Sequence, residues 1–340
     1  MKPKIMMISM KSNLRIVRYI GLLLMFIFCL TAQNMMAQRG KLFNSDNQLS
    51  SNLATQVFQD SNGFIWIATR NGLNVYDGYN FTVIRKTKED NRGLSSNYIN
   101  CITQDAQGHI LLGTNNSLLL YNGKSYANIP LLDSKNQPVS TYVTQVYRLK
   151  NNDIAVVTSG YGIMLKKEDA EVCYAMKGEV ENLKFIHKIL EDKQERLWII
   201  LESGKLYRAD KKGKLTKQIP GTETLEAQDI KQDAKGNIYL ATKNDGVYLL
   251  KAGSTVFTKI AGIGNLPIGN IYISRDQRLF IGCDGMGIFV YNPVTGFLQN
   301  NPLFSREVNL AKSKITSIIE DFTGNIWVSM LQKGVFMQSQ

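Results

Sequence analysis

Apolar runs of five residues, each bounded by turn residues, recur along the chain. Residues 65–69 read Ile-Trp-Ile-Ala-Thr, with Asn-Gly at 62–63 before them and Asn-Gly at 71–72 after them. Such a run has the length of a short strand but offers no polar position that would face solvent. The pattern therefore predicts short strands that are covered on both faces of their sheet.

Runs of this kind occur seven times at a nearly constant interval, which indicates a repeat protein. In chain order they are IWIAT ending at Thr69, ILLGT at Thr114, IAVVT at Thr158, LWIIL at Leu201, IYLAT at Thr242, LFIGC at Cys283 and IWVSM at Met330. Consecutive runs end between 41 and 47 residues apart, and about 40–50 residues is the length of a four-stranded propeller blade. We place the starts of the repeats near residues 51, 96, 141, 184, 225, 266 and 312.

Turn chemistry and the two chain ends support a propeller. Asp60-Ser-Asn-Gly63 suits a hairpin turn, because the Asp can accept backbone N–H groups and the Gly allows a positive φ. Similar turns begin at Asp105, Asp233 and Asp321. The last repeat ends in a third strand, GVFMQ, and residues 40–45 resemble its missing fourth strand. We predict an all-β fold, a seven-bladed β-propeller over residues 38–340 that its N-terminal strand closes.

The tryptophans occupy the same position in three of the seven runs. They are Trp66, Trp198 and Trp327. Large aromatic side chains in strands that are covered on both faces bury most of their surface. We therefore expect all three to pack between neighbouring blades rather than to bind a ligand.

The first 37 residues have the layout of a secretory signal peptide. Five Lys or Arg residues precede the apolar run 20–30, and small residues follow it. The run is shorter than the roughly 20 residues that a membrane-spanning helix needs. We therefore predict export to the periplasm, with cleavage after Ala37 or Ala32. An uncleaved N-terminal membrane anchor is the alternative.

Charge and cysteine content exclude several classes of protein. Removing residues 1–37 lowers the net charge from +12 to +7, since that segment has five basic residues and no acidic one. The remaining basic residues form no block, which argues against a nucleic-acid partner. Cys101, Cys173 and Cys283 remain, without a CxxC spacing. We expect them to be small core residues rather than a disulfide framework or a zinc site.

The repeated sequence Leu-Ser-Ser-Asn, then Asp-x-x-Gly-x-Ile-Trp-Ile-x-Thr, then Gly-Leu-x-x-Tyr-Asp resembles the two-component regulator propeller. That repeat forms the periplasmic sensor region of Bacteroides-type hybrid histidine kinases, and the resemblance covers about residues 40–340. It implies a periplasmic ligand-binding sensor module for an oligosaccharide, without a catalytic domain in this chain. It also implies a second propeller or sensor domain as partner, and leaves open a homodimer in the full sensor and whether the chain is a fragment.

Residues with catalytic chemistry are scarce. Only two histidines occur, His109 and His187, and they fall in different repeats. No nucleophile elbow, phosphate loop or HExxH motif is present. We therefore predict no catalytic residue, no metal site and no cofactor. The alternative function is an exported propeller enzyme that resembles virginiamycin-type lyases, which rely on His and a bound metal ion; the small number of histidines disfavours it.

A ligand is expected on one particular rim of the ring. The turn after each second strand and the approach to each first strand fall on the same face, whereas the Asp-x-x-Gly hairpins fall on the other. The first face carries planar polar and aromatic groups that suit sugar hydroxyls and apolar sugar faces. The candidate ligand-binding residues are Arg70, Asn71, Asn97, Asn115, Tyr161, Glu202, Lys243 and Asp284.

Overall fold

The computed structural model describes residues 40–87, 93–210, 212–216, 219–300, 303 and 309–339. Within these ranges it contains thirty β-strands and two short 3-10 turns, η1 (Glu179–Asn182) and η2 (Leu310–Lys312). No helix in this part of the chain is long and apolar enough to cross a membrane. The predicted signal peptide, residues 1–37, lies outside the described residues.

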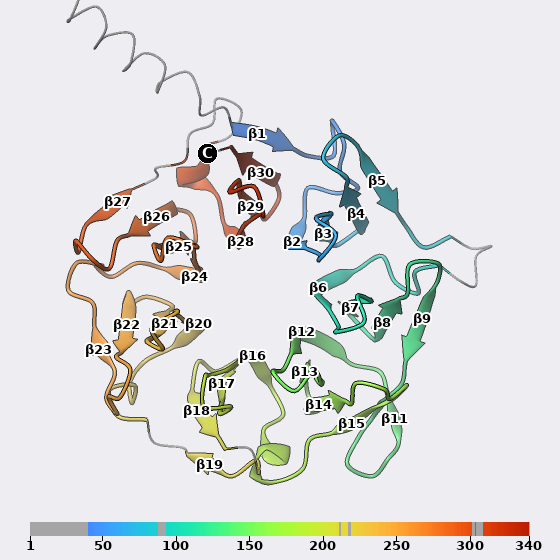
Figure 1. Ribbon diagram of the computed structural model, residues 1–340, viewed down its shortest axis with the longest axis horizontal. Helices are drawn as coiled ribbons and strands as arrows, with labels where there is room; N and C mark the ends of the chain where they lie inside the picture. Colours follow the sequence, from blue (N-terminus) through green and yellow to red (C-terminus); the bar gives the residue numbers. More distant parts are fainter. Residues whose placement is uncertain are drawn as a thin grey trace, which may run out of the picture.

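The strands form seven sheets that are arranged as blades around a central axis (Figure 1). The inner strands of blades 1 to 7 are β2 (Ala54–Gln59), β6 (Ile99–Gln104), β12 (Tyr142–Arg148), β16 (Ile186–Glu191), β20 (Ala227–Gln232), β24 (Ile268–Ile273) and β28 (Ile315–Glu320). The second strands are β3 (Ile65–Thr69), β7 (Ile110–Thr114), β13 (Ile154–Ser159), β17 (Leu197–Leu201), β21 (Ile238–Thr242), β25 (Leu279–Cys283) and β29 (Ile326–Met330). The predicted seven-bladed propeller is confirmed.

The outer half of each blade completes its antiparallel sheet. The third strands are β4 (Gly72–Tyr76), β8 (Leu118–Tyr121), β14 (Gly162–Lys166), β18 (Leu206–Ala209), β22 (Val247–Leu250), β26 (Gly287–Tyr291) and β30 (Gly334–Gln338). The outermost strands are β5 (Phe81–Ile84), β9 (Tyr126–Ile129), β15 (Cys173–Ala175), β19 (Leu215–Thr216), β23 (Thr258–Lys259), β27 (Leu298–Asn300) and β1 (Gly40–Phe43). Blade 3 departs from four strands, because the short strands β10 (Leu131–Leu132) and β11 (Pro138–Val139) extend its sheet beyond β15.

The N-terminal strand closes the ring. β1 runs antiparallel to β30 at the outer edge of blade 7, with Gly40 opposite Gln338 and Phe43 opposite Val335. The Phe43 ring stacks on the Trp327 ring at a centroid distance of 5.7 Å. The strand ends at Phe43, two residues earlier than the expected range.

The second strands form the core. All residues of β3, β7, β21, β25 and β29 are buried. Trp198 is fully buried in one cluster with Ile230 and Leu240 of the next blade. Trp66 and Trp327 are 5% and 1% exposed and likewise contact the following blade. The tryptophans therefore pack between blades, as their place in the repeat predicted.

Each tryptophan also has a hydrogen-bond partner that the sequence pattern did not reveal. Trp198 Nε1–H donates to Asp192 Oδ2 at 2.8 Å, while Asp192 Oδ1 accepts the backbone N–H groups of Gln194 and Arg196. The pairs Trp66 with Asp60 and Trp327 with Asp321 repeat this contact. A single carboxylate thus caps the hairpin and satisfies the buried indole.

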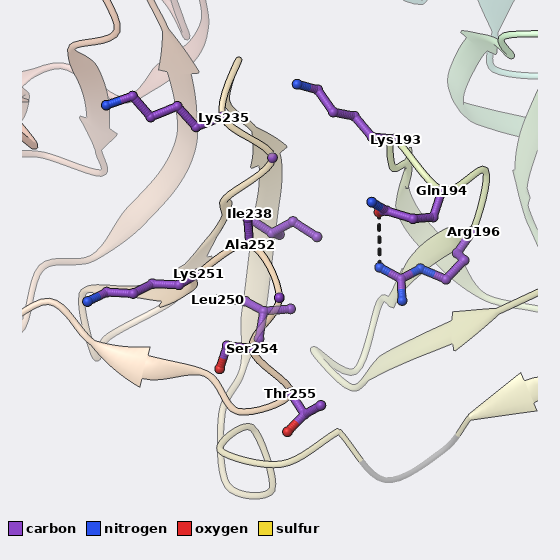
Figure 2. Close-up of a pocket in the computed structure, with 12 residues that line it drawn as sticks. Lys193, Gln194, Arg196, Lys235, Ile238, Leu250, Lys251, Ala252, Ser254 and Thr255 are labelled. Carbon is purple, nitrogen blue, oxygen red and sulfur yellow. Dashed lines mark hydrogen bonds between the residues drawn. The ribbon is translucent and has the colours of Figure 1, made fainter.

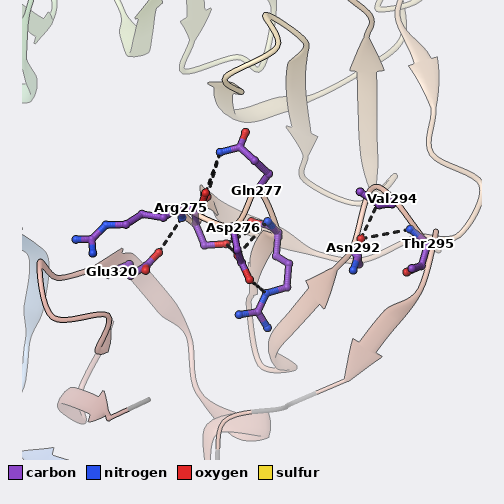
Figure 3. Close-up of polar contacts among 9 residues, drawn as sticks. Arg275, Asp276, Gln277, Asn292, Val294, Thr295 and Glu320 are labelled. Carbon is purple, nitrogen blue, oxygen red and sulfur yellow. Dashed lines mark hydrogen bonds and ion pairs between the residues drawn. The ribbon is translucent and has the colours of Figure 1, made fainter.

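The hairpins between inner and second strands attach each blade to its neighbour. Gln104 Oε1, at the end of β6, accepts the N–H of Ser61 in the hairpin of blade 1 at 2.8 Å. Glu320 Oε2, at the end of β28, accepts the N–H of Arg275 in blade 6 at 2.9 Å (Figure 3). Equivalent pairs are Gln59 with Phe322, Glu191 with Lys150 and Gln232 with Lys193. This side of the ring, the hairpin face, is held by structural contacts.

A β-bulge near the start of each inner strand brings a polar side chain against the next blade. In β2 the register shifts between Ala54 and Gln56, and the other six inner strands shift at the equivalent position. Gln56 accepts the N–H of Ile102 at 3.0 Å and donates to its carbonyl at 3.2 Å. Gln145 binds both backbone groups of Ile189 in the same way. These amides pair backbone groups at strand edges that have no neighbouring strand.

Candidate ligand-binding rim and channel

The face opposite the hairpins, here called the rim face, joins the end of each second strand to the start of the inner strand. Lys243, after β21, donates its backbone N–H to the carbonyl of Glu226, before β20, at 2.8 Å. Asp284, after β25, donates to the carbonyl of Pro267, before β24, at the same distance. The same contact places Arg70 beside Leu53 in blade 1. Residues at these two positions therefore share one face of the ring.

All eight predicted ligand-binding residues lie on the loops of the rim face, but they are distributed over six blades. Seven of them are exposed, and Asn97 is half-buried. Asn97 Oδ1 accepts the N–H of Lys86 at 2.6 Å, and its carbonyl accepts the N–H of Gly72. Asn115 Oδ1 accepts the hydroxyl of Ser96 at 2.9 Å. These two asparagines therefore bind neighbouring loops, and the eight residues, spread over six blades, do not converge on one site.

Aromatic residues that the sequence reasoning missed form an arc on blades 2 to 4. Tyr98, Tyr142 and Phe185 occupy the last positions before the first buried residue of β6, β12 and β16. The Tyr98 and Tyr142 rings meet edge to face at 6.3 Å. Tyr142 is 39% and Phe185 is 59% exposed. We call these three residues the aromatic arc; their recurrence immediately before the inner strand is the sequence signal that could have identified them.

Two predicted residues extend the aromatic arc. The Arg70 guanidinium lies 5.3 Å from the centroid of the Tyr98 ring, and Tyr161, between β13 and β14, is 39% exposed. Burial, followed by the neighbouring Tyr98, raises the pKa of Tyr142 to about 12. The Tyr142 hydroxyl therefore remains protonated at neutral pH and can donate a hydrogen bond.

The other half of the rim face carries paired charges. Lys243 Nζ lies 3.4 Å from Glu226 Oε2 in blade 5, and both side chains are 59% exposed. Lys314 of blade 7 lies 2.7 Å from Asp284 of blade 6. Exposed pairs of this kind contribute little stability. The rim face is thus divided into an aromatic half and a charged half.

A channel of about 560 Å³ lies inside the ring, bordered by the inner strands. Near the rim face its lining includes the bulge residues Thr55, Asn100, Thr144, His187 and Thr316. Near the hairpin face it includes Gln59, Glu320 and Phe322. Its volume falls within the roughly 300–1,000 Å³ of small-molecule sites.

The buried charges in the channel have a structural origin. Lys188 occupies in blade 4 the position that Gln56 holds in blade 1, but an ammonium cannot accept the N–H of Ile230. Asp229 accepts it instead at 2.8 Å and also accepts the N–H of Ile271 at 2.9 Å. Lys188 Nζ lies 3.0 Å from Asp229 Oδ1. The ion pair therefore compensates for a lysine at a position that needs an acceptor.

The two histidines lie in different places. His109 is on the hairpin face, where its Nδ1 is 3.0 Å from Asp105 Oδ2. His187 lines the channel, and burial, followed by the nearby Lys188, lowers the pKa of its imidazole. Within the described ranges, no group of three or more His, Cys, Asp or Glu side chains is arranged to hold a metal ion.

The three described cysteines are buried and unpaired with one another. They are Cys101, Cys173 and Cys283. Burial raises the pKa of each thiol to about 12. These thiols are therefore protonated and unreactive in the folded protein.

A second hollow, of about 360 Å³, lies between the hairpins of blades 4 and 5 (Figure 2). Gln194 and Arg196 border one side, and Ile238 and Leu250 border the other. The Arg196 guanidinium already donates to Asp192 at 2.7 Å and to Gln194 at 3.3 Å. The side chains of Lys235 and Lys251, which also belong to the lining, extend away from Arg196 (Figure 2). The hollow therefore presents few converging polar groups.

Comparison with known proteins confirms the resemblance to the regulator-propeller repeat. Residues 48–71 and 93–116 match the family described as the two component regulator propeller. Histidine kinase P4 from Formosa agariphila is 33% identical over 78 residues, which are 22% of this chain and 6% of that protein.

Solved structures share the fold at low sequence identity. The extracellular domain of a protein described as a hybrid two component system from B. thetaiotaomicron superposes with a TM-score of 0.74 at 22% identity, over 88% of this chain and 42% of that one. Virginiamycin B lyase from Staphylococcus aureus gives a TM-score of 0.67 at 14% identity, over 89% and 99%. The chain thus spans less than half the length of that extracellular domain.

Proposed function

We propose that the chain is the ligand-sensing propeller of a two-component signalling protein that operates outside the cytoplasm, and that it binds an oligosaccharide on the aromatic half of its rim face. The observation that carries this proposal is the aromatic arc, Tyr98, Tyr142 and Phe185, on three adjacent blades. Exposed aromatic rings on a face otherwise made of polar loops are typical of a binding surface.

The arc has the chemistry that a sugar chain requires. Pyranose rings have apolar C–H faces, which pack on aromatic side chains, and hydroxyl edges, which need planar hydrogen-bonding groups. Tyr142 and Phe185 supply exposed rings. Arg70 and the Tyr142 hydroxyl supply donors beside them. Because the rings come from successive blades, an extended oligosaccharide would contact several of them in turn.

The signalling role rests on the repeat. The matches to the two component regulator propeller fall on the inner and second strands of blades 1 and 2. A ring that binds ligand on its rim face needs a second domain to pass the signal on, so we propose a further propeller or sensor domain as its partner. The protein would then act in the periplasm, and the histidine kinase chemistry would belong to another part of the signalling protein.

Lyase activity is the competing function, since virginiamycin B lyase shares the fold. The positions of the histidines argue against it. His109 lies on the hairpin face beside Asp105, whereas His187 lines the channel. A mechanism that uses His and a metal ion needs these groups in one site.

Calorimetric titration with a panel of neutral oligosaccharides tests the ligand class. We expect one member of the panel to bind, and Tyr142→Ala and Phe185→Ala each to weaken that binding about tenfold, near 1.4 kcal/mol. Phe64→Ala is the matched control, because Phe64 is 40% exposed but lies after the hairpin of blade 1. The proposal fails if Phe64→Ala weakens binding as much as the arc variants do, or if no oligosaccharide binds.

A further inference from the structure

We propose that the central channel holds a second site, independent of the rim face, for a small hydroxylated carboxylate such as a hexuronic acid. The site lies where blades 4, 5 and 6 meet the channel. It is formed by Lys188, Lys231, His187 and Asn270, all of which belong to the channel lining.

The first observation is an unequal pairing of charges. Asp229 Oδ1 lies 3.0 Å from Lys188 Nζ and 3.4 Å from Lys231 Nζ, so two ammonium groups share one carboxylate. Both oxygens of Asp229 also accept backbone N–H groups, from Ile230 and Ile271. The carboxylate therefore has little capacity left for the two lysines, whose remaining N–H donors favour a second anion.

Other charges on the channel do not remove this excess. Glu320, the remaining acidic residue of the lining, is at the far end of β28, where it accepts the N–H of Arg275 on the hairpin face. Burial and then Lys188 lower the pKa of the His187 imidazole, which favours its neutral form. The side chains of Lys188 and Lys231 are 23% and 36% exposed, and both belong to the channel lining.

The second observation is an unused acceptor. Asn270 is 6% exposed, and its amide nitrogen donates to the carbonyl of Ile315 at 2.7 Å, which fixes the orientation of the amide. Its Oδ1 is buried and receives no hydrogen bond from any described residue. An unsatisfied buried oxygen costs about 1–3 kcal/mol, so a donor from a ligand or a water molecule is favoured there.

The two observations together define the ligand. A ligand carboxylate would pair with the two lysines, and a ligand hydroxyl group would donate a hydrogen bond to Asn270 Oδ1. Asn100 Oδ1 is a second buried acceptor in the lining without a partner among the described residues. A channel of about 560 Å³ has room for a single sugar acid. A neutral sugar would bring no anion to the lysines, and acetate would bring no hydrogen-bond donor to Asn270 Oδ1.

Ligand-observed NMR titration with sodium glucuronate tests the site, with glucose and acetate as the two partial ligands. We expect glucuronate to bind about tenfold more tightly than either. Lys231→Gln should reduce the affinity for glucuronate about tenfold, because it removes one of the two ammonium groups. The fold should be retained, since Asp229 keeps its ion pair with Lys188. Lys235→Gln is the control, since Lys235 lies in the hairpin of blade 5 and outside the channel lining.

Three results would overturn the proposal: equal binding of glucose or acetate, unchanged glucuronate binding by a Lys231→Gln protein with an unchanged melting curve, or a crystal soaked in glucuronate that shows only water beside Asn270. Tyr142→Ala separates this site from the rim face, because it should leave glucuronate binding unchanged. Loss of oligosaccharide binding at the aromatic arc would therefore leave the channel proposal standing, and the reverse also holds.

Discussion

At the residue scale, the aspartate that begins the hairpin in blades 1, 4 and 7 makes two kinds of hydrogen bond. Asp192 is fully buried, and it caps its hairpin with one oxygen while the other accepts the indole N–H of Trp198. Asp60 and Asp321 repeat the arrangement. The Asp-x-x-Gly turn could be read from the sequence as a turn signal, but the hydrogen bond from the Asp to the tryptophan six residues later depends on the depth of the hairpin. That depth is a property of the folded blade.

Replacing Trp198 should separate its packing from its hydrogen bond. Trp198→Ala should lower the free energy of unfolding by about 3–5 kcal/mol, as other large core truncations do. Trp198→Phe keeps most of the contacts with blade 5 but leaves Asp192 Oδ2 without the indole donor, so we expect a smaller loss of about 1–3 kcal/mol. Urea denaturation followed by circular dichroism measures both. Equal losses in the two variants would contradict this account.

The pH dependence of stability should report the ion pair of Asp229. Burial alone would raise the pKa of this carboxyl, but Lys188 and Lys231 outweigh burial and lower it to about 2, below its usual 3.8. The ionised group therefore stabilises the folded protein above about pH 4, and this contribution, about 2 kcal/mol, is lost as the pH falls through 2.

Urea denaturation at pH 5 and pH 2.5 tests this, with the double variant Lys188→Met, Asp229→Asn as the control. The double variant should lose less stability than the parent between these two pH values. Identical losses would show that Asp229 is not the titrating group.

At the element scale, register and side-chain alternation explain what sequence reading could and could not establish. Residues 65–69 and their six counterparts were assignable as strands because each run is buried on both faces and bounded by turns. Tyr98, Tyr142 and Phe185 escaped notice because each stands one position before the first buried residue of an inner strand, and the inner strands are not continuous apolar runs. Whether that position is buried or exposed depends on the neighbouring blade. The sequence pattern of one strand carries no information about that blade.

The buried Lys188 and Asp229 were missed for a related reason. Each stands directly after the bulge residue of its inner strand, and a bulge changes which side chains face the next blade. The two-residue alternation of buried and exposed side chains in a strand does not show where a bulge interrupts it. Position-by-position comparison of the seven inner strands would have placed both residues in one row with Gln56 and Gln145.

The closing strand can be probed through one glycine. Gly334 begins β30 with φ of +85°, and a Cβ there would lie 2.1 Å from the carbonyl oxygen of Phe43 in β1. Gly334→Ala should therefore displace β1 in addition to straining the backbone. Gly324, in the hairpin of the same blade, has φ of +92° and open space around it, so Gly324→Ala reports the strain alone, about 1–2 kcal/mol.

The measurements are urea denaturation and limited proteolysis at residues 40–43. We expect Gly334→Ala to lose more stability than Gly324→Ala and to become sensitive to protease at β1. Similar stability and similar protease resistance in the two variants would mean that β1 tolerates the added methyl group.

At the scale of the whole molecule, the ring has contacts between every pair of neighbouring blades, so its blades should unfold together. Cys101, Cys173 and Cys283 lie in blades 2, 3 and 6 and are buried. Each is therefore a local probe of a different blade. Labelling with a thiol reagent along a urea gradient, followed by peptide mass spectrometry, should give one midpoint for all three thiols. Separate midpoints would show that blades unfold independently.

The pairing of Gly40 with Gln338 has a mechanical consequence. The described chain begins and ends at one point on the outer edge of blade 7, so a pull that separates the two ends acts across β1 and β30 at the same end of the pair. Such a load would break the hydrogen bonds between these strands one after another, while the other six blades carried no tension. The weakest mechanical element of the ring is therefore the strand pair that closes it.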